Sequence, residues 1–361
     1  MKKNKWAKTK ITELLTINYP IIQGPLGGGV STVSLTTTVS NLGGLGSFGC
    51  QPYTVDEIIE YSNAICKLTD KPFNLNLWVN DRDERLVSFD KAEYEKLKKI
   101  FKHYFDELAI PLPEMPADLG PKYEDQLQAI LETKPPVFSF IYGIPSEDIL
   151  EKCRRNGTKT IGTATTVDEA IALEKAGVDA IVATGFEAGG HRASFIRSAE
   201  DSLTGTFTLI PQVADNVSIP VIAAGGIADA RGIKAAFTLG ADAVQIGTAF
   251  LATAQSNATE EHKQKLFSAE AKYTTLTKIF SGRLSRVIRN KLTEELNDKE
   301  HLLAPYPMQR KFMNSLQSAL IKNHKSEYIT FTSGQSAPLL KYKDAAELFH
   351  SLVKETDKLY S

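Results

Sequence analysis

Short runs of apolar and β-branched residues alternate with amphipathic stretches from Pro20 to about Leu251. This alternation is typical of parallel β-α-β units, in which each buried strand is followed by a helix. Eight runs have the length and composition of strands, at residues 20–24, 44–49, 73–78, 137–143, 158–164, 179–185, 219–226 and 242–248. Eight strands that are each followed by a helix, over roughly 230 residues, favour a closed (β/α)8 TIM barrel over an open sheet.

The segments between these strands carry helix start and stop signals. Two pairs have the spacing of capping boxes at helix starts: Thr54 with Glu57, and Thr166 with Glu169. Glycines stand where helices should end, at Gly43, Gly157, Gly177 and Gly240. In such a barrel the reactive groups are expected at the carboxyl ends of the strands.

Two segments depart from a plain barrel. Residues 80–135 place a long polar helix, at about Lys91 to Leu108, and a proline-rich connector after the third strand. An insertion at that end would cover a pocket. After Leu251 the chain becomes charged and helical. We therefore expect a barrel domain over residues 1–251, which includes the insertion at 80–135, and a helical extension over 252–361 that contributes to the substrate pocket.

Composition narrows the class of protein. Lysine and arginine number 42 against 43 aspartate and glutamate residues, so no nucleic-acid partner is expected. No run of about 18 apolar residues occurs, and the basic start of the chain lacks a signal-peptide core. We therefore expect a soluble, cytoplasmic protein without a membrane partner. The three cysteines are too scattered for a disulfide framework or a zinc site.

The segment "GGLGSFG" contains a G-x-G-x-x-G pattern at Gly44, Gly46 and Gly49. In a dinucleotide-binding fold a strand precedes these glycines and a helix opens after them. Here they follow the expected helix at residues 31–42 and lead into Gln51 and Pro52. We therefore interpret them as a helix stop and the second strand.

A better phosphate site is the pair of loops after the last two barrel strands. Gly225 and Gly226 in "AAGGIADARG" would let the backbone approach a phosphate, and Gly247 with Thr248 would add amides and a hydroxyl group. The alternative is that these glycines only relieve crowding in tight turns. Because both loops of the pair carry the signal, we favour phosphate binding.

His191 lies in "GFEAGGHRASF", after the sixth strand and among residues with little side-chain bulk. A neutral imidazole can accept a proton from carbon or stabilise a developing anion, and Gly189 and Gly190 would let the backbone pass close to a cofactor. The alternative is a surface histidine in a mobile loop. No ligand set with metal spacing accompanies it, so no metal is expected. Cys50 follows the second strand, but packing explains it better than a nucleophilic role.

The remaining strand-end groups are neutral. The amides of Gln23, Asn76 and Gln245 would bond the polar edge of an isoalloxazine ring, although strand-end hydrogen bonds explain any one of them alone. Lys159 sits near the amino end of its strand, which argues against a Schiff-base enzyme. Arg283 in "SGRLSR" and Gln335 in "SGQSAP" would reach the mouth from the extension, unless they are merely solvated. A phosphate cradle, neutral amides and one imidazole together point to a flavin.

The stretches "FNLNLW", "GFEAGGHRASF", "IPVIAAGGIADARGI" and "LGADAVQIGTAFL" resemble the nitronate monooxygenase family, formerly called 2-nitropropane dioxygenases. The resemblance runs nearly end to end and implies an FMN-dependent (β/α)8 barrel with His191 as the catalytic histidine. It implies FMN contacts from Asn76, Thr184, Gly189, Gly226, Gln245, Ile246, Gly247 and Thr248. Two positions depart from the family pattern, because Leu26 replaces a common methionine and Thr184 a frequent glutamine.

The resemblance implies oxidation of alkyl nitronates, and possible use of neutral nitroalkanes, by dioxygen to carbonyl compounds and nitrite. An FMN- and NADH-dependent enoyl-thioester reductase shares the AGGH and QIGT motifs and is the second hypothesis. A non-catalytic barrel that binds a phosphorylated ligand is the third. The expected partners are a small nitronate or nitroalkane and dioxygen, with the chain as a monomer or homodimer.

Overall fold

The structure is a computed structural model that describes residues 5–361. Its main sheet has eight parallel strands in the order β1-β9-β8-β6-β5-β4-β3-β2. The strands are β1 (Ile21–Gln23), β2 (Gly46–Gly49), β3 (Phe73–Trp78), β4 (Val137–Ile141), β5 (Lys159–Ala164), β6 (Ala180–Thr184), β8 (Val221–Ala224) and β9 (Ala243–Ile246). Ile22 forms a parallel bridge with Leu45 just before β2, which closes the sheet into a barrel. The predicted (β/α)8 barrel and its eight strands are therefore confirmed.

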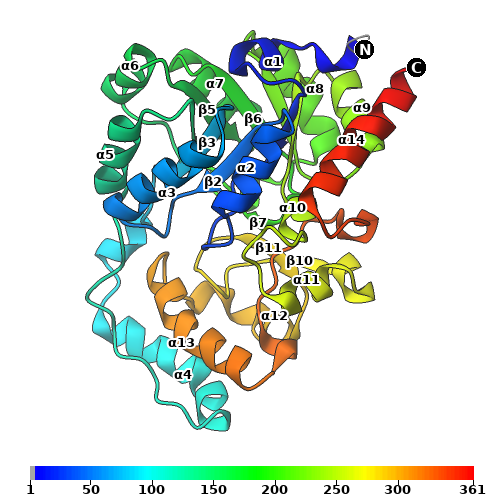
Figure 1. Cartoon of the computed structure of the whole chain (residues 1–361). Coiled ribbons are helices and arrows are strands. Elements are labelled where there is room, and N and C mark those ends of the chain that lie inside the picture. The colour runs from blue at the N-terminus through cyan, green and yellow to red at the C-terminus, as the bar shows by residue number, and fades with distance from the viewer. Residues whose placement is uncertain (1–4) are drawn as a thin grey trace.

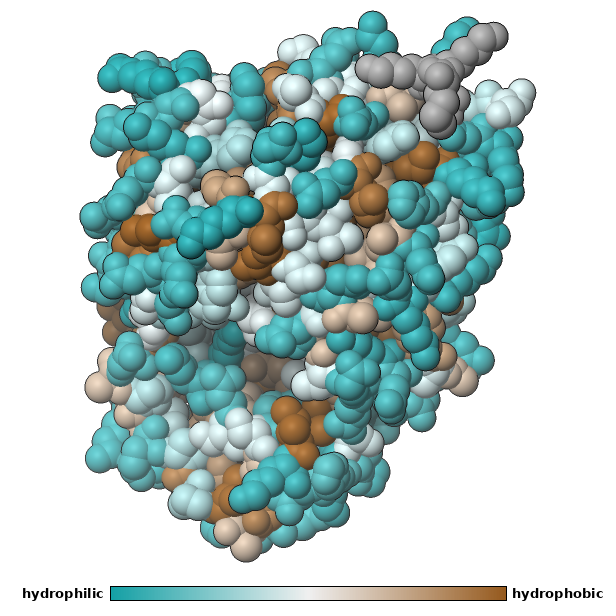
Figure 2. All heavy atoms as spheres, in the orientation of Figure 1, coloured by the Kyte–Doolittle hydropathy of each residue, from teal (hydrophilic) through white to brown (hydrophobic). Residues whose placement is uncertain are grey.

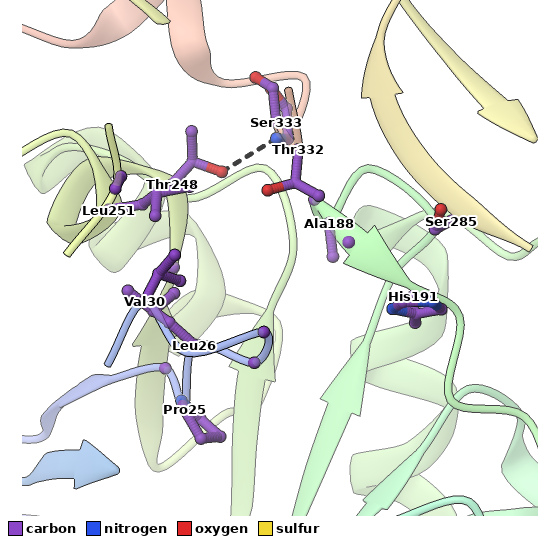
Figure 3. A pocket seen from close by; sticks show the side chains of 18 of the residues that line it. Pro25, Leu26, Val30, Ala188, His191, Thr248, Leu251, Ser285, Thr332 and Ser333 are labelled. Atoms are coloured by element: carbon purple, nitrogen blue, oxygen red, sulfur yellow. Dashed lines mark hydrogen bonds between the residues drawn. The ribbon is translucent and has the colours of Figure 1, made fainter. Parts of the chain in front are cut away.

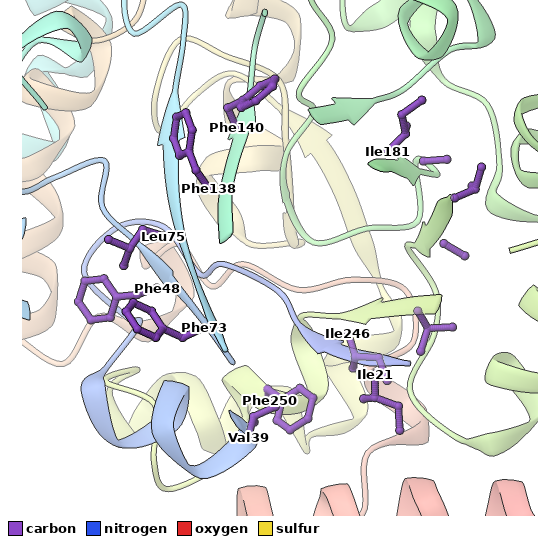
Figure 4. Packing of buried hydrophobic residues seen from close by; sticks show 14 of the residues in the cluster. Ile21, Val39, Phe48, Phe73, Leu75, Phe138, Phe140, Ile181, Ile246 and Phe250 are labelled. Carbon is purple, nitrogen blue, oxygen red and sulfur yellow. The ribbon is translucent and has the colours of Figure 1, made fainter. Parts of the chain in front are cut away.

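A ring of helices surrounds the barrel (Figure 1). It comprises α2 (Val33–Asn41), α3 (Val55–Leu68), α5 (Tyr123–Thr133), α6 (Glu147–Arg155), α7 (Val167–Lys175), α8 (Thr206–Asn216), α9 (Ala230–Thr238) and α14 (Ala345–Tyr360). Aromatic side chains such as Phe48, Phe73 and Phe138 fill the layer between strands and helices (Figure 4). The short helix α1 (Lys10–Leu15) packs Ile11 and Leu15 onto the amino end of the barrel.

The structure tests the local helix signals. Thr54 and Glu57 form a complete capping box at the start of α3. Thr166 caps α7, but the expected second half of its box is wrong, because the Glu169 carboxylate accepts from the Thr165 and Phe195 amides instead. The predicted helix stops all adopt positive φ angles: 93° at Gly43, 78° at Gly157, 81° at Gly177 and 100° at Gly240.

The glycines of "GGLGSFG" follow α2 and form β2, as predicted. A Cβ atom at Gly46 would lie 1.9 Å from the carbonyl oxygen of Thr36, so only glycine lets α2 pack directly on this strand. Close helix–strand packing, rather than phosphate binding, explains the pattern.

A second layer caps the carboxyl end of the barrel. The insertion supplies α4 (Lys91–Glu107), which matches the predicted polar helix, and the extension supplies α11 (Glu260–Leu266), α12 (Lys291–Glu295) and α13 (Met308–Lys322). Phe101 and Phe105 of α4 pack against Phe312 of α13, with ring centroids 5.2 and 5.5 Å apart. Insertion and extension therefore share one hydrophobic core, which we call the cap.

The extension differs from the expected helical segment in two ways. It contains an antiparallel hairpin of β10 (Thr274–Thr277) and β11 (Ser285–Ile288), which continues onto β7 (Gly190–His191). Its last helix, α14, packs against α9 and α2 and places Phe349 in the barrel core. The chain therefore completes the barrel's helical ring only after building the cap. No helix within residues 5–361 combines the length and apolar character needed to cross a membrane.

Candidate active site

A cavity of about 780 Å³ lies between the carboxyl ends of the barrel strands and the cap. A recess opens between these two layers on the mostly hydrophilic face seen in Figure 2. The loop that carries Pro25, Leu26 and Val30 forms one wall, and β7 with His191 lies across the space from it (Figure 3). The reactive groups of the barrel therefore lie at the predicted end of the strands.

The lining of this cavity carries one formal charge. Among the described residues no aspartate or glutamate lines it, and Arg310 of α13 is its single cation. The Arg310 Nη1–H group donates to Oε1 of Gln51 at 3.1 Å, and this arginine has no carboxylate within ion-pair distance in the described chain. A cavity with this lining favours anionic or electron-rich ligands over cations.

The structure places His191 in the cavity wall. Its strand β7 pairs with β11, so that His191 lies opposite Ser285. The Nε2 atom is 2.8 Å from Oγ of Ser281, and the ring meets that of Trp78 edge to face at 5.1 Å. Burial, together with the nearby cations Arg310 and Arg283, lowers the pKa of His191 to about 3. The imidazole is therefore neutral at physiological pH.

Hydrogen bonds around Ser281 favour one tautomer of this imidazole. The Ser281 hydroxyl lies 3.1 Å from the carbonyl oxygen of Arg283, which can only accept. A hydroxyl group that donates to this carbonyl accepts from Nε2 of His191, so these contacts favour the tautomer with its proton on Nε2. The lone pair of Nδ1 has no hydrogen-bond partner among the described residues, which leaves it free to accept a proton.

The loop after His191 is held by buried polar groups. Arg192 is 1% exposed and donates to the carbonyl oxygens of Thr184, Gly185 and Ser202 at 3.1, 2.8 and 3.0 Å. Further along, the fully buried Glu169 carboxylate accepts from the amide of Phe195 at 2.6 Å. The loop is therefore tied to β6 and α7, which argues against the alternative of a mobile surface histidine.

The predicted glycines divide into two groups by the space around them. A Cβ atom at Gly190 would meet nothing within 4 Å, and one at Gly247 would meet only a Leu26 atom at 4.0 Å. By contrast, a Cβ at Gly189 would lie 2.5 Å from the Gly334 amide, and one at Gly225 would lie 2.8 Å from Thr206 Oγ1. The first group has open space beside the backbone, whereas the second is tightly packed, although both line the cavity.

Polar groups line the cavity beside the open glycines. Gly226 lines the cavity with a φ of 72°, and a Cβ atom there would lie 3.5 Å from the Cβ of Glu187. Asn76 donates to Ser139 Oγ at 2.9 Å, and the Gln245 side chain makes no hydrogen bond within residues 5–361. Thr184 also lines the cavity, and Thr248 Oγ1 accepts from the Gly334 amide at 2.9 Å.

Two predicted cofactor contacts, Gln23 and Ile246, do not line the cavity and stay predictions. Gln23 does not line the cavity, because its Oε1 accepts from the Ser47 amide at 2.8 Å and its Nε2 donates to the carbonyl of Gly24. Ile246 is buried in the hydrophobic core. Its neighbour Gln245 lines the cavity, and successive side chains of a strand point to opposite faces.

Several wall residues escaped the sequence analysis. Trp78 lies two positions after Asn76 on β3, so strand alternation gave a usable signal for it. Ser281 is the first residue of the "SGRLSR" motif, but only Arg283 was singled out there. Arg310 carries no local signal, because it reaches the site only through the packing of α13 on the barrel.

Three other residues that were considered for a role in the site have contacts that explain them structurally. Burial raises the pKa of the Cys50 thiol to about 12, so packing explains this residue better than nucleophilic catalysis. Lys159 pairs with Asp179 at 3.2 Å near the amino end of β5. Gln335 does not line the cavity, although its amide donates to the carbonyl oxygen of Glu187 at 2.9 Å.

Comparison with known proteins agrees with this geometry. The family model "Nitronate monooxygenase" matches residues 8–355. A probable nitronate monooxygenase of Staphylococcus aureus strain Newman is 38% identical over 355 residues, which are 98% of this chain and 99% of that protein.

Two solved structures extend the comparison. A nitroalkane oxidase from Streptomyces ansochromogenes superposes with a TM-score of 0.88 and 32% identity, over 97% of this chain and 98% of that one. FabK from Thermotoga maritima superposes with a TM-score of 0.75 and 30% identity, over 98% of this chain and 97% of that one. The chain therefore belongs to the nitronate monooxygenase family and is an oxidoreductase.

Proposed function

We propose that this protein uses FMN and dioxygen to oxidise alkyl nitronates, and neutral nitroalkanes as well, to carbonyl compounds and nitrite. The observation that carries the proposal is a neutral imidazole with a free Nδ1 lone pair, in a cavity that no carboxylate lines. Such a cavity accepts an anionic nitronate without charge repulsion, and the imidazole can generate that anion from a neutral nitroalkane.

The residues present fit a flavin. The backbones of Gly190 and Gly247 leave space at the cavity wall that a Cβ atom would fill. Gly226 also lines the cavity, and Thr248 adds a hydroxyl group. We assign the phosphate end to this region. The free amide of Gln245 and the Asn76 amide would bond the polar edge of the ring. When bound, the flavin would accept an electron from the nitronate and pass it to dioxygen.

The chain's own residues would prepare the substrate. Nδ1 of His191 would take the α-proton of a neutral nitroalkane, while Nε2 keeps its hydrogen bond to Ser281. The positive charge of Arg310 would stabilise the resulting nitronate in the weakly solvated cavity. A pre-formed nitronate needs no proton transfer, so its oxidation should depend less on His191.

One experiment tests the proposal and its alternatives. The purified protein, loaded with FMN, is mixed anaerobically with a nitronate, and flavin absorbance is followed before air is admitted and nitrite is measured. Loss of absorbance followed by nitrite formation supports the proposal. Rapid bleaching by NADH without nitronate oxidation would instead favour the enoyl-thioester reductase that the resemblance includes. A protein that gains no flavin absorbance would favour the ligand-binding barrel.

A further inference from the structure

We propose that Arg283, clamped by Asp83 and two tyrosine rings, is a positioning residue that aligns Ser281 and thereby His191. The inference rests on the proposed role of His191 as a base. It assigns to the cap a specific task in the reaction, because Asp83 lies in the insertion and Arg283 lies in the turn between β10 and β11.

The clamp has a closed set of contacts. The Arg283 Nε–H group donates to Asp83 Oδ1 at 2.7 Å, and Arg283 is only 9% exposed. Its guanidinium carbon lies 4.2 Å from the ring centre of Tyr142 and 4.5 Å from that of Tyr306. The other Asp83 oxygen accepts from the Tyr306 amide at 2.8 Å. One hydrogen bond and two ring faces therefore hold the guanidinium group in place.

The clamp acts on the imidazole through two short links. The carbonyl oxygen of Arg283 accepts from the Ser281 hydroxyl at 3.1 Å, and Ser281 Oγ is 2.8 Å from His191 Nε2. Gly282 makes the turn between them with a φ of 89°, and a Cβ atom there would lie 2.5 Å from the carbonyl oxygen of Ala304. The positions of the guanidinium group and the imidazole are therefore coupled.

Tyr142 shows that the protein sustains backbone strain at this clamp. It ends the run of β4 with a φ of 63°, a left-handed conformation that is rare for a bulky side chain. Its hydroxyl group is buried without a hydrogen-bond partner, as is Nη1 of Arg283. Strain of this kind persists where the surrounding structure over-determines it, commonly at functional sites. Here it places the tyrosine ring on the guanidinium group.

The clamp also sets the electrostatic field at His191. The ionisable groups that face this histidine are Arg310 from α13, Tyr306 before that helix, and Arg283 from the β10–β11 turn. The Trp78 ring lies 5.1 Å from the imidazole and 6.0 Å from the guanidinium carbon. Both arginines lower the pKa of His191, so loss of Arg283 should raise it.

The test compares Arg283→Gln, Arg283→Lys and Asp83→Asn with the control Arg154→Gln. Arg154 is an exposed arginine that pairs with Glu151 on α6. For each FMN-loaded protein, kcat/KM is measured against pH with a neutral nitroalkane and with its pre-formed nitronate. We expect Arg283→Gln to lose about 10- to 100-fold with the nitroalkane, because small misplacements of a base cost that much. With the nitronate the loss should stay within about threefold, since no proton transfer is needed.

The two substitutions at position 283 separate geometry from charge. Arg283→Gln should also raise the acid limb of the nitroalkane profile by about one pH unit. Lysine keeps the charge but lacks the planar fork, so its acid limb should stay near that of the wild type while its rate falls. Asp83→Asn should lower the nitroalkane rate as well, and it provides the test if the Arg283 variants do not fold. The Arg154 control should match the wild type.

An NMR titration of isotopically labelled histidines in the flavin-free protein reports on the clamp independently of turnover. We expect a neutral His191 with its proton on Nε2 in the wild type, and a pKa raised by about one unit in Arg283→Gln. Unchanged His191 signals and an unchanged ratio of nitroalkane to nitronate activity in folded variants would overturn the proposal. If the protein oxidised no nitro compound at all, the proposed function would fail, but this titration would still test whether Arg283 positions His191.

Discussion

Replacing Gly247 with alanine probes the cofactor cradle without disturbing the fold. Gly247 follows β9 with a φ of −101° and a ψ of −71°, close to the right-handed conformation that alanine adopts readily. A Cβ atom there would lie 4.0 Å from its nearest neighbour, Cδ2 of Leu26, so the flavin-free chain has room for a methyl group. That methyl group would occupy space that we assign to the phosphate end of the flavin.

The two effects of this substitution have opposite signs. Without flavin, alanine should leave the free energy of unfolding unchanged or raise it by about 0.4–1 kcal/mol, because the unfolded chain loses conformational freedom. With flavin, the methyl group should weaken binding about 10- to 100-fold, which corresponds to roughly 1.4–2.7 kcal/mol. A stable protein that binds flavin poorly is therefore the expected result.

Urea unfolding of the flavin-free protein and quenching of FMN fluorescence on titration measure these two quantities. Gly185→Ala is the matched control, because its Cβ would lie 2.1 Å from Thr206 Oγ1, and such crowding should cost about 1–3 kcal/mol of stability even without flavin. Wild-type flavin affinity in Gly247→Ala would refute the placement of the cofactor. If flavin-free Gly247→Ala lost more than about 1 kcal/mol in its free energy of unfolding, the interpretation that the space beside Gly247 is open would be refuted.

Four further outcomes follow from the same structure. His191→Asn should retain FMN but lose about 10²- to 10⁴-fold in kcat/KM with a neutral nitroalkane, measured by nitrite release, and a smaller loss would show that another group accepts the proton. The pKa of His191 is about 3 in the folded protein and near 6.5 in the unfolded chain, so the unfolded chain binds a proton more readily. The free energy of unfolding should therefore fall as the pH is lowered from about 6.5 to about 3. His191→Asn should flatten that decline in urea titrations, and an equally steep decline in the variant would contradict the lowered pKa. Glu169→Ala should destabilise the flavin-free protein by about 3–5 kcal/mol in urea, because several buried amides lose their acceptor, and a loss below about 1 kcal/mol would be inconsistent with these contacts. A thiol reagent at pH 8 should label Cys66, which is exposed, and spare Cys50, whose burial raises its pKa to about 12, as mass spectrometry of the digested protein would show.

The barrel could be predicted from sequence because its signals are local. Each strand is a short apolar run bounded by glycine, proline or a helix cap, and these signals depend only on neighbouring residues. The hairpin of β10 and β11 could not be found in this way, because β11 is completed by the two-residue strand β7, which lies far earlier in the chain. The return of α14 to the barrel likewise depends on contacts with α2 and α9 rather than on its own pattern.

The residues of the candidate site also separate into those with a local sequence signal and those placed by contacts with distant parts of the chain. Gly190 and Gly247 could be predicted to line the cavity because a glycine in a loop after a barrel strand is a local signal. Gln23 could not be placed in this way, because a strand-end amide can equally serve its neighbours, and here it bonds Ser47. Arg310 was missed because it reaches the imidazole only through the packing of the cap, whereas Trp78 on β3 had a usable signal in strand alternation.

The separation between barrel loops and cap residues predicts which substitutions alter proton transfer and which alter cofactor binding. The loops that we assign to the cofactor belong to the barrel, whereas the cations that lower the pKa of His191, Arg283 and Arg310, both come from the cap. Asp83 and Arg283 are 200 positions apart in sequence, yet their ion pair joins the insertion to the extension beside the imidazole. Changes in the cap should therefore alter proton transfer and substrate choice while flavin binding persists. A methyl group at Gly247 should do the reverse, because it removes space for the cofactor and leaves the imidazole in place.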